Sequence, residues 1–289
     1  MDRRTRVGKT AAVTAVTLMA FGPSIMKSSD LPAMTFVLWR LLFGALGYAI
    51  VLIATRRDFG WLELRRSALG GFIFGVTLVF FFAAMKRTSA ANAVVISALQ
   101  PVILLGVAGR LFGERPPRSL YGWSTVSIGG VALAMYASDG SGVASRSGDL
   151  LAVASMLLFS LYYVVSKRVR SELDSVSYQL GLTLVAALTI VPIALVAGHP
   201  ITPPSGADWW PVVLMAVLPG TGHLLTNYAH AHVSLSVMGL IGLLFTAIAP
   251  LYAWWLVGEQ IVALQAIGMT VVVAALAVVV TRPAEPISI

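Results

Sequence analysis

The sequence predicts an all-α integral membrane protein of ten transmembrane helices, arranged as two inverted five-helix repeats. Three observations support this prediction. Of the 289 residues, 58% are hydrophobic and 11% are charged, so too few polar side chains exist to cover a water-soluble surface. Ten charge-poor runs of about 20 residues have the length needed to cross the ~30 Å hydrocarbon core. The third observation is an internal repeat.

The repeat relates residues 75–114 to residues 220–259. At a constant shift of 145 positions, 10 of the 40 residue pairs are identical. Each copy consists of an apolar span, a short turn, a second apolar span and a final Gly-Glu, which ends at Glu114 in one copy and at Glu259 in the other. A repeat of this length indicates a fold built from two copies of one unit.

A second alignment extends the repeat to the first span. Residues 8–27 match residues 148–167 at a shift of 140. We therefore predict two five-span units, residues 1–145 and 146–289, joined by a Gly- and Ser-rich linker. Since five is odd, the second unit enters the membrane from the opposite face, as in many secondary transporters. The expected spans are residues 8–26, 33–54, 68–85, 91–112, 120–137, 150–166, 177–197, 209–229, 236–257 and 261–281.

The basic residues predict the orientation of these spans. With the N-terminus in the cytoplasm, the cytoplasmic segments carry 15 Lys and Arg residues and the other side carries 4, as the positive-inside rule requires. We expect a multi-pass protein of the cell inner (plasma) membrane with both termini cytoplasmic. This arrangement accounts for the net charge of +8 without a nucleic-acid partner. The apolar start is expected to remain as the first span, because it has a partner in the repeat.

Hydroxyl groups recur along the first span and along its partner, the sixth. Thr10, Thr14 and Thr17 share one helical face, and Tyr162 lies on a comparable face of the sixth span. Such a stripe can line a polar cavity. It can equally serve packing, because small hydroxylated residues favour contacts between membrane helices. Both interpretations remain open.

Arg40 is the one charge well inside the hydrocarbon, about two turns from the outer end of the second span. A structural role is favoured, in which the side chain snorkels to the interface at modest cost. The alternative is contact with a negatively charged substrate.

Polar groups and helix breakers coincide in the fourth and eighth spans. Gln100 needs hydrogen-bond partners at mid-membrane depth, and Pro101 frees a carbonyl one turn earlier. In the eighth span, Pro219 precedes His223 and Asn227, which share a face. Kinks with structural hydrogen bonds are the alternative to a transport pathway in both spans.

The ninth span carries Thr246 at the position of Pro101, and its own proline follows one turn later. The substrate-binding candidates are Thr14, Thr17, Ser97, Gln100, Tyr162, His223, Asn227 and Thr246, and the hinge candidates are Pro101, Pro219, Gly220 and Pro250.

In these residues the chain resembles the EamA-type family of the drug/metabolite transporter superfamily over essentially its full length. The resemblance is carried by Trp39-Arg40, by residues 91–101 with Gly113-Glu114, by residues 236–250 with Gly258-Glu259, and by Asn227-Tyr228-Ala229. It implies inverted repeats around a central cavity formed by spans 1, 3, 4, 6, 8 and 9. It also implies export or exchange of small metabolites, often amino acids or related compounds, with drugs as a further class. The displaced proline at Pro250 is a departure that leaves the second hinge in doubt.

The acidic residues shape the expected mechanism. All 12 fall at span ends or in loops, and carriers driven by protons or sodium commonly place a carboxylate at the midplane. We therefore expect uncoupled export or exchange, or proton coupling through His223. Glu114 and Glu259 are expected to pair with basic loop residues or to cap the next helix. His230 and His232 are expected to be solvated in a turn.

Other classes of protein are less consistent with the sequence. No cysteine, nucleotide-binding motif or metal-ligand cluster is present, so we expect no cofactor, no metal and no primary pump. An intramembrane enzyme using His223 would lack an acid to orient the imidazole. A non-transporting scaffold is the third possibility. The expected partners are a small-molecule substrate and the lipid bilayer, and a homodimer is left open.

Overall fold

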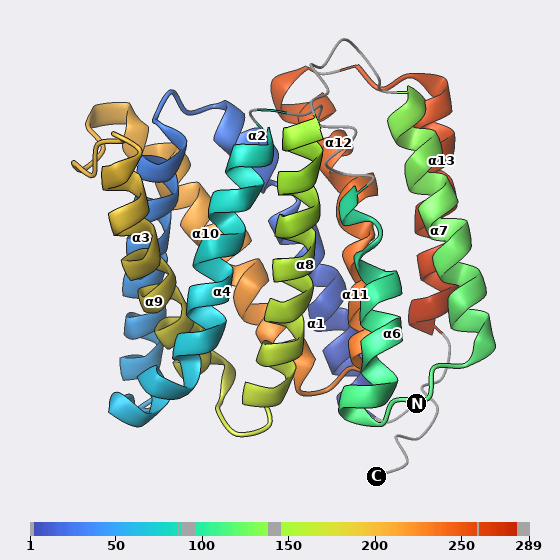
Figure 1. The fold of residues 1–289 in the computed structure, drawn as a ribbon, viewed down its shortest axis with the longest axis horizontal. Coiled ribbons are helices and arrows are strands. Elements are labelled where there is room, and N and C mark those ends of the chain that lie inside the picture. Colours follow the sequence, from blue (N-terminus) through green and yellow to red (C-terminus); the bar gives the residue numbers. More distant parts are fainter. Residues whose placement is uncertain (1–2, 86, 88–95, 138–145, 259, 282–289) are drawn as a thin grey trace.

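The computed structural model describes residues 3–85, 87, 96–137, 146–258 and 260–281, and all regular elements in them are helices (Figure 1). In chain order they are α1 (Arg3–Met19), α2 (Gly22–Lys27), α3 (Ala33–Ala54), α4 (Trp61–Met85), α6 (Gln100–Phe112), α7 (Arg118–Ala137), α8 (Arg146–Val169), α9 (Ser175–Val196), the 3-10 turn η1 (Gly206–Asp208), α10 (Trp209–His230), α11 (Leu235–Gly242), α12 (Leu244–Val257) and α13 (Ala263–Thr281).

The described helices identify a multi-pass membrane protein but do not confirm the number ten. Seven helical stretches within the described residues are long and apolar enough to cross a bilayer. They are residues 3–26, 33–54, 61–84, 146–169, 175–196, 235–256 and 263–281. The predicted fourth, fifth and eighth spans fall on α6, α7 and α10. Of these, α6 has 13 residues, and polar groups such as His223 and Asn227 interrupt the apolar sequence of α10.

One end of the bundle collects the basic loops, and we call it the basic end. There α1 begins, α13 ends, and the α3–α4, α6–α7 and α8–α9 connections turn (Figure 1). Lys9 ties the two terminal helices together, because its ammonium group donates to the Val280 carbonyl at 2.9 Å. The loops at this end carry the arginines of the predicted cytoplasmic side, including Arg56, Arg57 and Arg115.

Corresponding helices of the two copies run in opposite directions, and equivalent helix pairs between the copies are in contact. α1 leaves the basic end, whereas its counterpart α8 runs toward it (Figure 1). The pairing of α1 with α10 recurs as the pairing of α8 with α4, and α3 with α10 recurs as α9 with α4. α6 packs on its own counterpart α11, and α7 on α13. The helices therefore follow a two-fold pattern.

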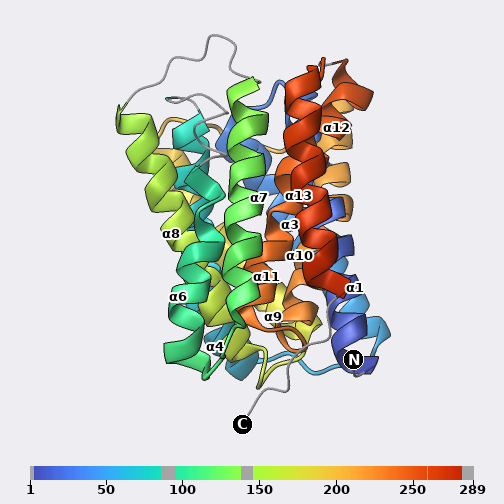
Figure 2. The same ribbon diagram turned by 90° about the vertical axis from the view of Figure 1, so that its right-hand side faces the viewer.

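Small residues allow the closest of these approaches. A Cβ at Gly222 of α10 would lie 2.7 Å from the Ala15 carbonyl oxygen on α1. At one edge of the bundle, where α7 and α13 stand side by side (Figure 2), a Cβ at Gly268 would lie 2.5 Å from the Gly130 carbonyl oxygen. Only glycine permits such backbone contact between membrane helices.

Some predicted features lie outside the described residues. These are Glu259, most of the predicted turn at residues 86–90, residues 91–95 at the start of the predicted fourth span, and all but the last two residues of the linker at 138–147, including the predicted boundary at 145.

Candidate functional site

A cavity of about 320 Å³ lies between the two copies. It is lined by residues of α1, α2, α4, α8, α10, α11 and α12, by the start of α6 and the residues just before it, and by one residue of α3. The lining residues are Met19, Gly22, Pro23, Met26, Arg40, Phe74, Thr77, Leu78, Phe81, Phe82, Ser97, Ala98, Gln100, Ser155, Met156, Phe159, Tyr163, Met215, Pro219, His223, Gly239, Gly242, Leu243, Phe245 and Thr246.

Four of the predicted substrate-binding residues meet at this cavity: Ser97, Gln100, His223 and Thr246. The His223 ring packs edge-on against Phe74, with centroids 5.0 Å apart. The Thr246 hydroxyl donates to the carbonyl of Leu243, the residue just before α12, at 2.7 Å. Gln100 is buried, and its Nε2 has no hydrogen-bond partner among the described residues.

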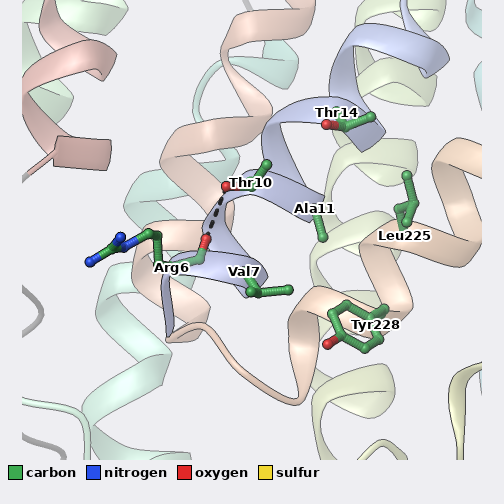
Figure 3. Close-up of a pocket in the computed structure, with 7 residues that line it drawn as sticks. All are labelled: Arg6, Val7, Thr10, Ala11, Thr14, Leu225 and Tyr228. Carbon is green, nitrogen blue, oxygen red and sulfur yellow. Dashed lines mark hydrogen bonds between the residues drawn. The ribbon is translucent and has the colours of Figure 1, made fainter. Parts of the chain in front are cut away.

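The threonines of α1 do not reach the cavity. Thr14 lies on the outer surface, in a hollow of about 440 Å³ between α1 and α10 (Figure 3). Its neighbours there include Val7, Ala11 and Leu225, so the hollow is mainly apolar. The Thr17 hydroxyl donates to the Val13 carbonyl at 2.9 Å. The α1 stripe therefore does not line this cavity, because α1 is rotated to turn its alanines inward.

Tyr162 and Asn227 also lie outside the cavity, toward the basic end. The Tyr162 hydroxyl donates to Asn227 Oδ1 at 3.3 Å. Asn227 Nδ2 in turn donates to Gln179 Oε1, and Gln179 Nε2 donates to Thr183 Oγ1 at 3.2 Å. The Asn227 carbonyl accepts from Arg170 Nε at 2.8 Å. We call these five residues the polar layer; Asn227 at its centre is 0% exposed.

The polar layer lies next to the cavity, on the side of the basic end. Asn227 stands one helical turn beyond His223 on α10, and Tyr162 adjoins the cavity-lining Tyr163 on α8. Its hydrogen bonds join helices of one copy, because α8, α9 and α10 all belong to the second unit. This satisfaction of polar groups by one another is what buried amides and hydroxyls require.

Glu114 adds a clamp between the two copies at the same end. Its carboxylate accepts from the Leu235 N–H at 2.6 Å, the Ser236 N–H at 3.2 Å and the Ser236 hydroxyl at 2.8 Å. The Lys167 ammonium lies 3.7 Å from the carboxylate and donates to the Val233 carbonyl at 2.7 Å. Glu114 thus joins the end of α6 to the first turn of α11 and to α8.

One sequence expectation about this end is confirmed, since Glu114 pairs with a basic residue, Lys167, and two others need correction. The helix capped by Glu114 is α11, the counterpart of its own span, and not the next helix, α7. Gly113 makes this possible by ending α6 in the left-handed conformation (φ 64°). His230 is 1% exposed and packs edge-on against Tyr163, with centroids 4.7 Å apart, so the expectation of a solvated side chain was wrong.

The position of the Arg40 side chain also differs from the one that the sequence predicts. It is 8% exposed and lines the cavity, so it does not snorkel to the membrane interface. The resemblance assigned the second span to the periphery, yet α3 contributes this one residue to the cavity wall. Two turns further along α3, the Tyr48 hydroxyl donates to the Gly220 carbonyl of α10 at 2.7 Å. That bond fixes α3 against α10.

The helices of the fourth and ninth spans break at equivalent points beside the cavity. α6 begins after a turn at Ala98 and Leu99, and α11 is separated from α12 at Leu243, which is position 98 shifted by 145. Pro101 explains the first break, since its ring clashes with a carbonyl one turn earlier. At the second break Thr246 replaces the proline, and its N–H bonds the Leu243 carbonyl three residues back at 3.1 Å.

The other hinge candidates lie inside helices. Pro219 and Gly220 are within α10, and Pro250 is within α12. Pro219 lines the cavity and Gly220 receives the Tyr48 hydrogen bond. Their movement as hinges remains a prediction.

Comparison with known proteins gives the following. The model of the EamA-like transporter family matches the chain twice, at residues 6–136 and 146–281. One solved crystal structure, described only as that of a protein, superposes with a TM-score of 0.80 at 17% identity, covering 96% of this chain and 97% of that one. At this identity the likeness concerns the fold alone. No curated protein matches the chain.

Proposed function

The chain belongs to the EamA-like transporter family, and from this premise we propose that it is a secondary transporter that moves small metabolites by alternating access. The observation that carries the proposal is the cavity of about 320 Å³ between two oppositely oriented copies. Its volume falls at the lower end of the range for small-molecule sites. A site at the interface of inverted repeats can be opened to either face by rocking one part against the other.

We take the described state to be closed toward the basic end, because the polar layer and the Glu114 clamp both lie on that side of the cavity. Opening that end requires α6 to part from α11 and α8, which breaks the three hydrogen bonds to Glu114 and its ion pair with Lys167. The breaks at Ala98–Leu99 and at Leu243 place flexible points of the same two spans beside the cavity. Bending there would move the clamp without disrupting the helices outside the break.

We assign the basic end to the cytoplasm of the cell inner (plasma) membrane by the positive-inside rule. The direction proposed is export or exchange, and the proposed cargo is an amino acid or a related compound, with drugs as a second class. No carboxylate is among the described residues that line the cavity. Transport driven by the substrate gradient alone is therefore favoured over coupling to a cation.

Transport is tested with purified full-length protein in proteoliposomes. Uptake of a panel of labelled amino acids, organic acids and cationic drugs is measured with and without an imposed pH gradient, and the compound retained inside is identified chemically. Accumulation of unchanged label down its own gradient is the expected result. Conversion of the label would indicate an enzyme, and absence of flux for the whole panel would favour a scaffold.

The role of His223 is tested in the same vesicles with His223→Ala. Flux driven by the substrate gradient should persist, because the ring packs on Phe74 and has no hydrogen bond to a described residue. His199→Ala, which alters a histidine outside the cavity, is the matched control. A pH-driven flux that disappears in His223→Ala and remains in the control would establish proton coupling instead.

A further inference from the structure

The described residues that line the cavity carry positive charge and no negative charge. Arg40 is the only charged side chain among the described residues that line it. The described lining residues include no aspartate or glutamate, and their other polar groups are neutral. An arginine enclosed in membrane protein without a counter-ion costs several kcal/mol.

Arg40 has no bonding partner in the part of the chain that the structure describes. Its Nε is buried with no hydrogen bond, and no ion pair joins its guanidinium to a described carboxylate. Gln100 Nε2, a second donor on the cavity wall, is likewise without a partner. Guanidinium groups carry five N–H donors and no acceptor. The cavity therefore offers donors in excess of acceptors.

The rest of the wall is apolar and aromatic. Phe74, Phe81 and Phe82 of α4 face the cavity, together with Phe159 of α8 and Phe245 of α12. Such a surface favours a hydrocarbon or aromatic body next to the charge. It offers no carboxylate to an ammonium group.

We infer that Arg40 is the anion-binding residue of this cavity and that its substrates are small organic carboxylates with an apolar body. The guanidinium forms paired hydrogen bonds with the carboxylate, which relieves the buried charge, while the phenylalanines pack on the body. This inference rests on the proposed transport function and names the chemical class of its cargo.

The test uses three matched compounds that differ only in their polar group: hydrocinnamate, its neutral amide and phenylpropylamine. Binding to the purified full-length protein is measured by titration calorimetry. We expect hydrocinnamate to bind more tightly than the amide and the amine. Arg40→Gln should weaken hydrocinnamate at least about tenfold and leave the amide unaffected, and Arg40→Lys should retain part of the affinity because it keeps the charge without the planar fork.

A control separates binding from folding and from simple loss of charge. Arg110→Gln removes an exposed arginine at the basic end and should leave hydrocinnamate binding unchanged. Without ligand, Arg40→Gln should unfold at the same temperature as the wild type or higher, because it removes an unpaired buried charge. A lower unfolding temperature with unchanged hydrocinnamate affinity would make Arg40 structural and overturn the inference.

The remaining outcomes are also decisive. Equal or tighter binding of the amide or the amine, or no binding of hydrocinnamate at millimolar concentration, would overturn the anion site. Flux of a cationic drug in proteoliposomes that is undiminished in Arg40→Gln would keep the transporter and reject the anion site. Hydrocinnamate binding that depends on Arg40, without flux of any compound, would keep the site and reject transport.

Discussion

The cavity and the polar layer lie about one helical turn apart on α8 and α10, yet their polar groups differ in hydrogen bonding. In the layer, Tyr162, Asn227 and Gln179 bond one another. In the cavity, Arg40 and Gln100 keep buried donors that no described residue accepts. Paired groups stabilise a closed protein, whereas unpaired donors are available to a ligand. Polar side chains at membrane depth therefore do not by themselves mark a binding site. Whether these side chains have hydrogen-bond partners must also be known.

Two side chains in this region are exceptions. Both ring nitrogens of His230, and Nη1 of Arg170 in the polar layer, are buried without a hydrogen bond to any described group. The packing of His230 against Tyr163 explains the position of its ring but not its unpaired nitrogens.

The largest expected effect comes from breaking the clamp with Glu114→Ala. The Glu114 side chain is 7% exposed, and its loss removes the acceptor of the Leu235 and Ser236 N–H groups in the first turn of α11 and leaves Lys167 without its counter-ion. We expect the free energy of unfolding to fall by about 3 kcal/mol. Thermal unfolding of the purified protein measures this. Glu172→Ala is the matched control, since its pair with Arg66 is solvent-exposed and should matter by about 0.5 kcal/mol at most. An equal loss of unfolding free energy in the two variants would contradict the role of Glu114 as a clamp.

A smaller effect is expected from Asn227→Leu, which removes the centre of the polar layer. The change removes the group that donates to Gln179 Oε1 and the group that accepts from the Tyr162 hydroxyl, both in a buried region. We expect a loss of about 2 kcal/mol, measured by thermal unfolding. A double variant with Gln179→Leu should cost less than the sum of the single changes, because the amide left unpaired is then absent. Strict additivity would show that the two amides do not depend on one another.

A third, weaker effect on stability is expected from Asp174, in the loop between α8 and α9. This effect depends on pH. Asp174 caps α9 by accepting from the N–H groups of Val176 and Ser177, and it pairs with Arg57. Burial alone would raise the pKa of Asp174, but these hydrogen bonds outweigh it and hold the pKa below the ordinary value of 3.8. The unfolded chain therefore takes up the proton first as the pH falls. Stability from Asp174 is present above that value and is lost as the pH decreases through the lower pKa of the folded state.

Asp174→Asn isolates this effect because asparagine can still cap the helix. The side chain is 39% exposed, so solvent screens the ion pair and we expect a loss of only about 0.5 kcal/mol at neutral pH. The difference in unfolding temperature from the wild type should shrink as the pH is lowered below about 4. A difference that stays constant in acid would assign the effect to packing.

The sequence predicted the helices and the repeat because both depend on local pattern. Apolar runs set the helices, and the shift of 145 positions located equivalent breaks at Ala98 and Leu243. The four cavity residues were found because polar groups next to helix breakers at mid-membrane depth are costly unless a cavity or another helix satisfies them.

The other predicted binding residues lie outside the cavity for a physical reason. Sequence gives the depth of a side chain and its face on a helix, but not the group that stands across from it. Asn227 meets Gln179, which is 48 positions away, and Glu114 meets Leu235, which is 121 positions away. Gln179 was not among the predicted residues. It is the only amide side chain in α9, and this was the available signal. Thr14 faces outward because the alanines of α1 allow closer packing against α10.

The smallest effect on stability should come from Gln100→Leu, which makes the same change of amide to leucine as Asn227→Leu but on the cavity side. Since Gln100 Nε2 bonds no described group, replacing it removes a desolvation cost and breaks no hydrogen bond. We expect an unchanged unfolding temperature, together with about fivefold weaker binding of the transported compound, because one donor to it is lost. Thermal unfolding and titration of the same sample measure both. A protein destabilised as much as Asn227→Leu would show that Gln100 has a structural partner, and the distinction between cavity and layer would then fail at this residue.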